Sequence, residues 1–322
     1  MEIRKWLKDA GVNSVLSIPE LKQELESLEK GSFEALDDFQ LKGKMGQIHQ
    51  GFQIRMPLLP RGRGIYRAVK VAERPSNKAR ISYPPVDRVT SNGRANRAGE
   101  VMFYGADPGA HQFGSCLQEC RCQVGEFYAV SGWLTTEPML FTHLGFSQKR
   151  LTALKSEREL PHYTTYIFDE RTEMLREWQA RVFTQSVPDG REDLYRLPIA
   201  LKEWAFGNGQ PLSGMGPGAP THISGIIYPS IAMWLLTDNV AILPNEVDSK
   251  MALFEVILLT VDSITKTGLP DGGTKTVFDI KPYDYARESD GGTLVWGQKS
   301  QVLRKFGQNL NLPVAPMVLA PD

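Results

Sequence analysis

Cysteine is scarce in this chain, and its placement argues against a disulfide-rich protein. Only three of the 322 residues are cysteine, and all three lie in one short segment as Cys116, Cys120 and Cys122. An odd number of clustered cysteines does not make a disulfide framework, and no His or Cys pair elsewhere has zinc-finger spacing. A metal site at this segment is one interpretation. Because cysteine is commonly buried, we instead predict three core thiols and no metal.

An excess of charge and a long apolar run are also missing. Lys+Arg and Asp+Glu both number 37, so the formal net charge is zero, and we expect neither a nucleic-acid nor a membrane partner. The longest apolar run, residues 251–261, contains Glu255 and is too short to span a bilayer. The first residues, MEIRKWLKDAG, lack the apolar segment of a signal peptide. We therefore expect a cytoplasmic protein, or one delivered into a target cell by a secretion system that needs no such signal.

Several well-known catalytic motifs do not occur. There is no G-x-S-x-G, and the five histidines have no metal-ligand spacing. The glycines of residues 207–220 are not followed by the Gly-Lys-Ser/Thr of a phosphate-binding loop. A hydrolase triad, a histidine metal centre and a P-loop enzyme are thus not indicated. His222 either lines a site or is a structural histidine, and the second interpretation is commoner.

The apolar content, 41%, is enough for a packed core. Apolar and β-branched runs predict strands at 65–71, 101–105, 126–133, 224–228, 239–243 and 252–263. Helical spacing predicts helices at 148–159, 169–182 and 194–206. Because these strands and helices do not alternate regularly, an α+β fold is favoured over a doubly wound sheet.

Residues 1–60 have the pattern of a helical N-terminal extension. Ser17-Ile18-Pro19-Glu20 is a capping box with proline early in the helix, and Gly31 marks a stop. Between them, leucines recur at helical spacing as Leu21, Leu25 and Leu28. The extension either packs on the main domain or docks an inhibitor or delivery partner, and packing is the commoner use of an amphipathic helix.

The most informative stretch is residues 91–119. It holds a Gly93-Arg94-x-Asn96-x-x-Gly99 turn, an apolar strand ending at Tyr104, and a segment that carries Glu119. A guanidinium suits a diphosphate, a tyrosine ring suits a flat cationic ring, and a carboxylate stabilises an oxocarbenium ion. The chain also contains Tyr66-Arg67 before this stretch and Tyr228-Pro229-Ser230 after it.

Three of these residues have competing interpretations. Arg67 shares a strand face with apolar side chains, so it needs either a buried carboxylate or a bound diphosphate as partner. Glu119 is either a site carboxylate or a solvated helix residue, and Glu126 is a rival for the same role. Ser230 follows a proline at a strand end, and with no base beside it we do not interpret it as a nucleophile.

Taken in order, these pieces resemble the RES-domain toxins, which are named for an arginine, a glutamate and a serine. The resemblance covers about residues 61–265 and includes an Asn239-Val240-Ala241 strand after the serine, whereas Ala95 stands where the family has an aromatic residue. It implies an α+β fold with a split, twisted mixed β-sheet of the ADP-ribosyltransferase-toxin type and surrounding helices. The catalytic domain would then span 61–322, with a helical insertion at about 146–220.

The same resemblance implies an activity and a set of site residues. The enzyme would cleave the nicotinamide–ribose bond of NAD, with water as acceptor in a glycohydrolase or phosphate in a phosphorylase. NAD is then a consumed substrate, no cofactor is needed, and an antitoxin or immunity protein is the expected partner. The catalytic residues implied are Arg67, Glu119 and Ser230, and the substrate-binding residues are Arg94, Asn96, Tyr66, Tyr104 and Tyr228.

Two other functions stay open at this point. A protein ADP-ribosyltransferase would use the same residues with a protein acceptor, since access to the site decides the acceptor. A non-catalytic nucleotide-binding or interaction module is the third interpretation, and the missing aromatic at Ala95 favours it slightly. The Gly- and Pro-rich stretch 207–220 is either a flap over the site or a plain connector.

Overall fold

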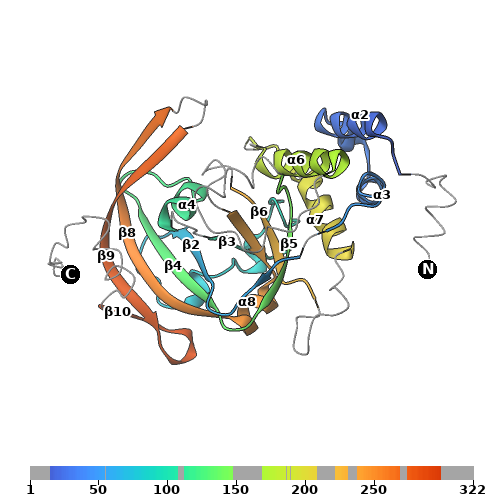
Figure 1. Ribbon diagram of the computed structural model, residues 1–322. Helices are drawn as coiled ribbons and strands as arrows, with labels where there is room; N and C mark the ends of the chain where they lie inside the picture. The colour runs from blue at the N-terminus through green and yellow to red at the C-terminus, as the bar shows by residue number, and fades with distance from the viewer. Residues whose placement is uncertain are drawn as a thin grey trace.

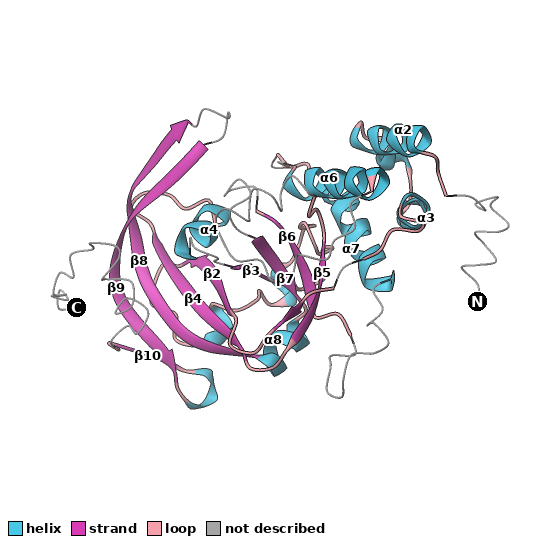
Figure 2. Ribbon diagram, viewed as in Figure 1, coloured by secondary structure: helices cyan, strands magenta, loops and turns pink. Residues whose placement is uncertain are grey.

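The computed structural model describes residues 15–54, 56–107, 112–147, 169–185, 187–188, 190–208, 222–230, 238–268 and 274–298. These residues form one large mixed sheet with helices gathered mainly at one end of it (Figures 1 and 2). The predicted α+β class is confirmed. The predicted helix at 148–159 and nearly all of the stretch 207–220 lie outside the described residues.

Ten strands make up the described sheet, in the order β1-β5-β6-β7-β3-β2-β4-β8-β9-β10. Neighbouring strands are antiparallel except β5 and β6, which are parallel, so the sheet is mixed as expected. The strand bounds are β1 Leu58–Leu59, β2 Gly64–Lys70, β3 Phe103–Asp107, β4 Phe127–Thr135, β5 Met139–His143, β6 Gly225–Pro229, β7 Asp238–Ile242, β8 Met251–Gly268, β9 Thr274–Glu288 and β10 Leu294–Trp296.

At the centre of the sheet, strands β2 and β3 are paired over a very short length. Strand β2 pairs with β4 along its whole length, from Gly64↔Leu134 to Lys70↔Tyr128. On its other side it pairs with β3 at one position, Tyr66↔Ala106. The backbones of β2 and β3 therefore diverge next to Arg67, and its side chain lies at the point where they separate.

Side chains of β2 alternate between the two faces of the sheet, and each face packs against different residues. Ile65 is fully buried against Phe103 and Trp133 on one face. Tyr66 and Ala68 pack on the other face, against Cys116 and its neighbours in helix α4, Gln112–Glu119. In Figure 1 this helix lies inside the curve of the sheet.

The N-terminal helices pack on the helices that follow β5. Helices α2, Ile18–Glu29, and α3, Asp38–Ile48, share one core with α6, Glu170–Thr184, and α7, Arg196–Asn208 (Figure 1). Helix α2 begins as predicted, with the Ser17 amide donating to Glu20 Oε2 at 2.8 Å, and it ends before Gly31, whose φ is 95°. The described part of residues 1–60 is thus helical and packs against α6 and α7.

The remaining helical elements are short. They are η1 Ser32–Ala35, η2 Lys78–Arg80, η3 Val86–Arg88, η4 Glu192–Tyr195, α8 Pro244–Lys250 and η5 Asp290–Gly292. None of the described helices is long and apolar enough to cross a membrane. In the same part of the chain, no group of His, Cys, Asp or Glu side chains is arranged to hold a metal ion.

Candidate functional site

A cavity of about 310 Å³ lies where α4 covers the centre of the sheet. This volume is at the lower end of the range found for small-molecule pockets. The walls come from β2, β3, α4, β6 and β7 together with the turn that precedes β3. Six of the predicted site residues line the cavity, namely Tyr66, Arg67, Arg94, Tyr104, Glu119 and Tyr228. Asn239, on the strand that follows Ser230, lines it as well.

Glu119 ends α4 and is held by two residues from distant parts of the chain. Its Oε1 atom accepts a hydrogen bond from Ser230 Oγ at 2.6 Å and another from Asn239 Nδ2 at 2.7 Å. Ser230 is 2% exposed at the end of β6, and Asn239 is buried on β7. The described residues donate no hydrogen bond to the second oxygen, Oε2, so the carboxylate is fixed through one oxygen only.

The rival carboxylate, Glu126, lies outside the cavity wall. It forms an ion pair with Lys70, and Tyr128 donates its hydroxyl to Glu126 Oε2 at 2.7 Å. These hydrogen bonds, first from Lys70 and then from Tyr128, lower the pKa of Glu126. Of these two carboxylates, Glu119 is the one that lines the cavity.

Arg67 lies on β2 next to its single residue pair with β3, and it lines the cavity. Its Nη1 atom donates to the carbonyl of Tyr104 at 2.7 Å, and its Cζ atom lies 5.6 Å from the centre of the Phe103 ring. No carboxylate in the described part of the chain forms an ion pair with it, and its buried Nε has no hydrogen-bond partner there. Burial lowers the pKa of this guanidinium, which nonetheless stays charged at any ordinary pH. The alternative of an internal Arg67 ion pair finds no support among these residues.

Arg94 is anchored from the opposite side by the end of α6. Its Nη1 atom donates to the carbonyls of Phe183 at 2.7 Å and Gln185 at 3.0 Å, and its Cζ atom lies 5.6 Å from the centre of the Tyr195 ring. Carbonyls at a helix C-terminus lack helical partners and carry partial negative charge, so a guanidinium is well placed there. None of the described carboxylates forms an ion pair with Arg94.

The turn that carries Arg94 is tied to Tyr104. The Tyr104 hydroxyl donates to Asn96 Oδ1 at 2.6 Å and accepts from the Ala95 amide at 2.9 Å. A Cβ atom on Gly93 would lie 2.4 Å from Asn96 Oδ1, which explains the glycine at this position. Burial raises the pKa of Tyr104, so the hydroxyl remains a donor.

Asn96 itself is not on the cavity wall. Its Nδ2 atom donates to the Arg97 carbonyl at 2.9 Å and its Oδ1 accepts from Tyr104 of β3, so both polar atoms of the side chain have partners. The structure thus gives Asn96 the task of shaping the turn, while its predicted substrate contact stays a prediction. Ala95 is fully buried beside Tyr104 and belongs to the helical core.

Two further tyrosines, Tyr228 and Tyr66, lie on the cavity wall. Tyr228 is 3% exposed and lies 5.0 Å from the Phe183 ring, centroid to centroid. Tyr66 packs against Gly132, where a Cβ would come within 3.1 Å of its ring. Burial raises the pKa of both phenols, so each is a neutral, apolar surface with a polar end.

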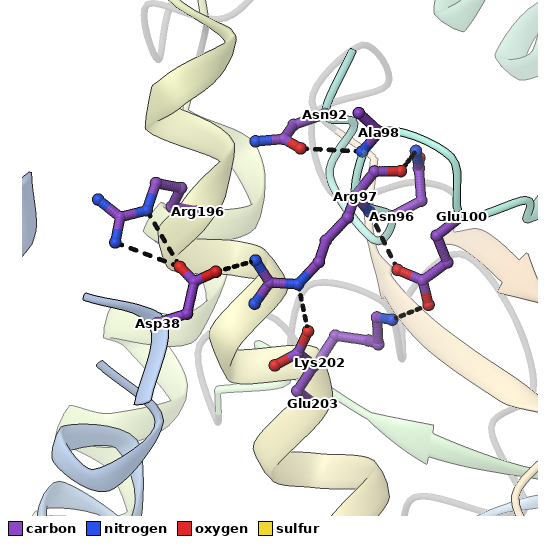
Figure 3. A network of polar contacts seen from close by, with 9 residues as sticks. All are labelled: Asp38, Asn92, Asn96, Arg97, Ala98, Glu100, Arg196, Lys202 and Glu203. Atoms are coloured by element: carbon purple, nitrogen blue, oxygen red, sulfur yellow. Dashed lines mark hydrogen bonds and ion pairs between the residues drawn. The ribbon is translucent and has the colours of Figure 1, made fainter. Parts of the chain in front are cut away.

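A polar network joins the turn of residues 93–99, which carries Arg94, to the layer formed by helices α2, α3, α6 and α7 (Figure 3). Arg97 forms ion pairs with Asp38 of α3 and, from Nε at 2.8 Å, with Glu203 of α7. Lys202 Nζ donates to Glu100 Oε1 at 2.6 Å, and Glu100 Oε2 accepts from the Arg97 amide at 3.0 Å. The N-terminal extension therefore contacts, through Asp38, the same turn that presents Arg94.

His222 belongs to a separate cluster. Its Nε2 atom lies 2.5 Å from Glu246 Oε1, and Ser224 Oγ and Lys250 Nζ donate to Glu246 Oε2 at 2.5 Å and 2.9 Å. These contacts are away from the cavity wall, so the structural interpretation of His222 is favoured. The stretch 207–220, as a possible flap, lies almost wholly outside the described residues.

The structure adds wall residues that sequence reasoning did not select. Asn239 was placed only on a strand, although its position on the strand that follows the predicted site serine was a usable signal. Cys116 and Cys120 line the cavity, and none of the three cysteines is in a disulfide. The prediction of core thiols holds for Cys116 and Cys122, which are buried, while Cys120 is half-buried.

Comparison with known proteins gives no relatives: no family model, no curated protein and no solved structure matches the chain.

Proposed function

We propose that the protein cleaves the bond between nicotinamide and ribose in NAD. The observation that carries this proposal is the carboxylate of Glu119, held by Ser230 and Asn239 on a wall that also presents Arg67 and Arg94. One fixed negative charge lies in a cavity with two guanidinium groups. That arrangement suits a ligand with an anionic diphosphate and a reacting sugar that becomes positive.

The two arginines are suited to the diphosphate for a physical reason. Both are positioned by backbone carbonyls, which fix their direction without neutralising their charge. A planar guanidinium can then offer its remaining N–H groups to phosphate oxygens in pairs.

Glu119 supplies the charge that the reaction needs. When the bond from ribose C1′ to the nicotinamide nitrogen breaks, its electron pair leaves with nicotinamide and the ribose becomes an oxocarbenium ion. A nearby carboxylate stabilises that cation more than it stabilises the bound substrate, which lowers the barrier. Addition of water and loss of one proton then give ADP-ribose, whereas addition of phosphate gives the phosphorylated sugar.

The tyrosines favour the same ligand. Tyr66, Tyr104 and Tyr228 give the cavity flat apolar surfaces, and aromatic faces attract a cationic ring such as nicotinamide in NAD. Support also comes from the order of the sequence pieces that resemble RES-domain toxins. The single residue pair between β2 and β3 agrees with a split sheet of the ADP-ribosyltransferase-toxin type, which is part of this proposal.

Such an activity has consequences for the cell. Loss of NAD stops growth, so the proposal includes a toxin or effector that acts in the cytoplasm and is neutralised by an antitoxin or immunity protein. A protein acceptor would make the same site an ADP-ribosyltransferase, and the products distinguish the acceptors.

The test is product analysis with purified protein and NAD. Chromatography should show nicotinamide together with ADP-ribose in plain buffer, or together with a phosphorylated ADP-ribose when phosphate is required. Radiolabelled ADP-ribose attached to added proteins would assign the transferase instead. NAD that binds but stays intact under all three conditions would support the nucleotide-binding module and refute the catalytic proposal.

A further inference from the structure

The end of α4 brings two thiols together beside Arg67. Cys120 lines the cavity and Cys122 follows it in the turn after the helix. Arg121 between them has a φ of 50°, in the left-handed region that residues other than glycine rarely adopt. This turn folds the chain back, so that the Cys122 amide donates to the Leu117 carbonyl at 3.2 Å, and Cys120 packs against the same core cluster that contains Cys122.

The surroundings of Cys120 stabilise its thiolate. The Cys122 thiol is a donor to its sulfur, the Lys70 backbone amide is a second donor, and the positive charge of Arg67 lies nearby. The largest of these effects is the hydrogen bond from Cys122; together they outweigh burial and the negative charge of Glu126, and the pKa of Cys120 falls to about 7. A thiolate in an electropositive, partly exposed position is the reactive form of cysteine.

The other two cysteines are in different states. Burial, with the nearby Cys120, raises the pKa of Cys116 to about 12. Donation to Cys120, followed by burial, raises the pKa of Cys122. One thiol on the cavity wall thus favours its reactive form, and a second thiol, which keeps its proton, lies two residues further along the chain in the core cluster against which the first one packs.

We propose that Cys120 and Cys122 form an oxidisable dithiol, with Cys120 as the modification site for small hydroperoxides that enter the cavity and Cys122 as the resolving thiol. This inference concerns thiol chemistry alone, and it holds whether or not the cavity takes NAD.

The chemistry balances with hydrogen peroxide as the oxidant. The Cys120 thiolate attacks one peroxide oxygen, the O–O bond breaks, and the leaving hydroxide takes a proton to become water. Cys122 then attacks the sulfur of the sulfenic acid at Cys120, an S–S bond forms, and a second water leaves. Two thiols lose two protons and two electrons in total, and one peroxide takes them up to become two waters.

The sequence offers a direct way to detect the product. Trypsin cuts after Arg97, Arg121 and Lys149, so the reduced protein gives separate peptides 98–121 and 122–149. After peroxide treatment and alkylation, mass spectrometry should find these two peptides joined, or uncut, with the loss of two hydrogen atoms. Cys116, which lies in the first peptide, should remain alkylated.

Matched serine variants assign the roles. Cys122→Ser should stop at a sulfenic acid on Cys120 that dimedone traps, and Cys120→Ser should give neither sulfenic acid nor disulfide. Cys116→Ser is the control and should form the disulfide at the wild-type rate. Circular dichroism would confirm that each variant is folded, and any unfolded variant is replaced by Ala at the same position.

Alkylation with iodoacetamide gives an independent measurement on the folded wild-type protein. Cys120 should react at least ten times faster than Cys116 at pH 7, and its rate should rise through an inflection near pH 7. A disulfide that includes Cys116, a first modification at Cys116 or Cys122, or equal alkylation rates at pH 7 would overturn the proposal.

Discussion

Ser230 donates its hydroxyl to Glu119 at 2.6 Å, although 111 residues separate the two in sequence. Asn239 donates to the same oxygen from the neighbouring strand, so one carboxylate oxygen receives two hydrogen bonds. We therefore give Ser230 a positioning role toward the Glu119 carboxylate. The relationship joins the end of α4 to the ends of β6 and β7.

Removing either donor should lower kcat for nicotinamide release. We expect Ser230→Ala and Asn239→Ala each to lower kcat by about 10-fold to 100-fold, because a hydrogen bond to a charged group contributes roughly 1.5–3 kcal/mol. The KM for NAD should change little. In a Glu119→Gln background the same substitutions should have no further effect, since the charge that they position is gone. Full additivity of the losses would show that the two donors act through something other than Glu119.

Arg67→Lys should weaken NAD binding although it keeps the positive charge. Lysine cannot offer the paired donors of a guanidinium, so we expect KM to rise at least 10-fold, or about 1.4 kcal/mol, with a smaller change in kcat. Arg74→Lys is the matched control, because Arg74 pairs with Asp284 and lies outside the cavity wall. Equal KM values for both variants and wild type would remove Arg67 from the binding site.

The network around Arg97 predicts that the N-terminal helices support the site. Arg97→Ala removes ion pairs to Asp38 and Glu203, which are partly exposed, so the free energy of unfolding should fall by about 1 kcal/mol or less. The turn that presents Arg94 should loosen, and KM for NAD should rise. Arg191→Ala, which removes exposed ion pairs elsewhere, should leave KM unchanged. Unchanged KM in Arg97→Ala would separate the helical layer from the site.

His49 predicts a pH dependence of stability. It is 2% exposed between Trp204 and Gln179, with Nδ1 2.9 Å from the Met45 carbonyl, and burial lowers its pKa from 6.5 to about 3. Between pH 6.5 and 3 the unfolded chain binds this proton and the folded chain does not. Stability from this residue is therefore complete above pH 6.5 and is lost as the pH falls.

The free energy of unfolding should fall by about 1 kcal/mol for each pH unit below 6.5 because of His49, since one pKa unit corresponds to roughly 1.4 kcal/mol. Urea unfolding of wild type and His49→Gln at several pH values from 6.5 to 4.5 would measure it. The comparison uses the slope against pH, because the substitution also changes packing. The slope should be shallower in His49→Gln, and identical slopes would mean that His49 is protonated in the folded protein.

Occupancy of the cavity should protect Cys120. In Glu119→Gln, which is expected to bind NAD without consuming it, saturating NAD should slow iodoacetamide alkylation of Cys120 at least several-fold. Alkylation of unfolded protein under the same conditions controls for an effect of NAD on the reagent. An unaltered rate at Cys120 would place NAD elsewhere.

Much of the fold was predictable where local chemistry decides it. The bounds of α2 followed from the Ser17–Glu20 capping box and Gly31, and β2 and β7 followed from short apolar runs. Strand β9 was not predicted, because TKTVFDIKPYDYARE is rich in charge and contains a proline. It is a strand because it pairs along most of β8, and that partner cannot be seen from the segment itself.

The sequence indicated which residues line the cavity better than it indicated the hydrogen bonds between them. Arg67, Arg94, Tyr104, Glu119 and Tyr228 all reach one cavity, and Ser230 reaches it through Glu119. The local sequence could not show that the Asn96 side chain would bond to Tyr104, or that Asn239 would face Glu119. Both depend on the register and spacing of strands that are distant in sequence.

The most direct test of the central claim compares two isosteric variants in NAD cleavage. Glu119→Gln and Glu126→Gln remove one charge each from carboxylates seven positions apart, but only Glu119 lies on the cavity wall. Nicotinamide release, measured by chromatography on folded proteins, should fall by about two to three orders of magnitude in Glu119→Gln and stay near wild type in Glu126→Gln. Wild-type release by Glu119→Gln, or no release by the unmodified protein, would contradict the account.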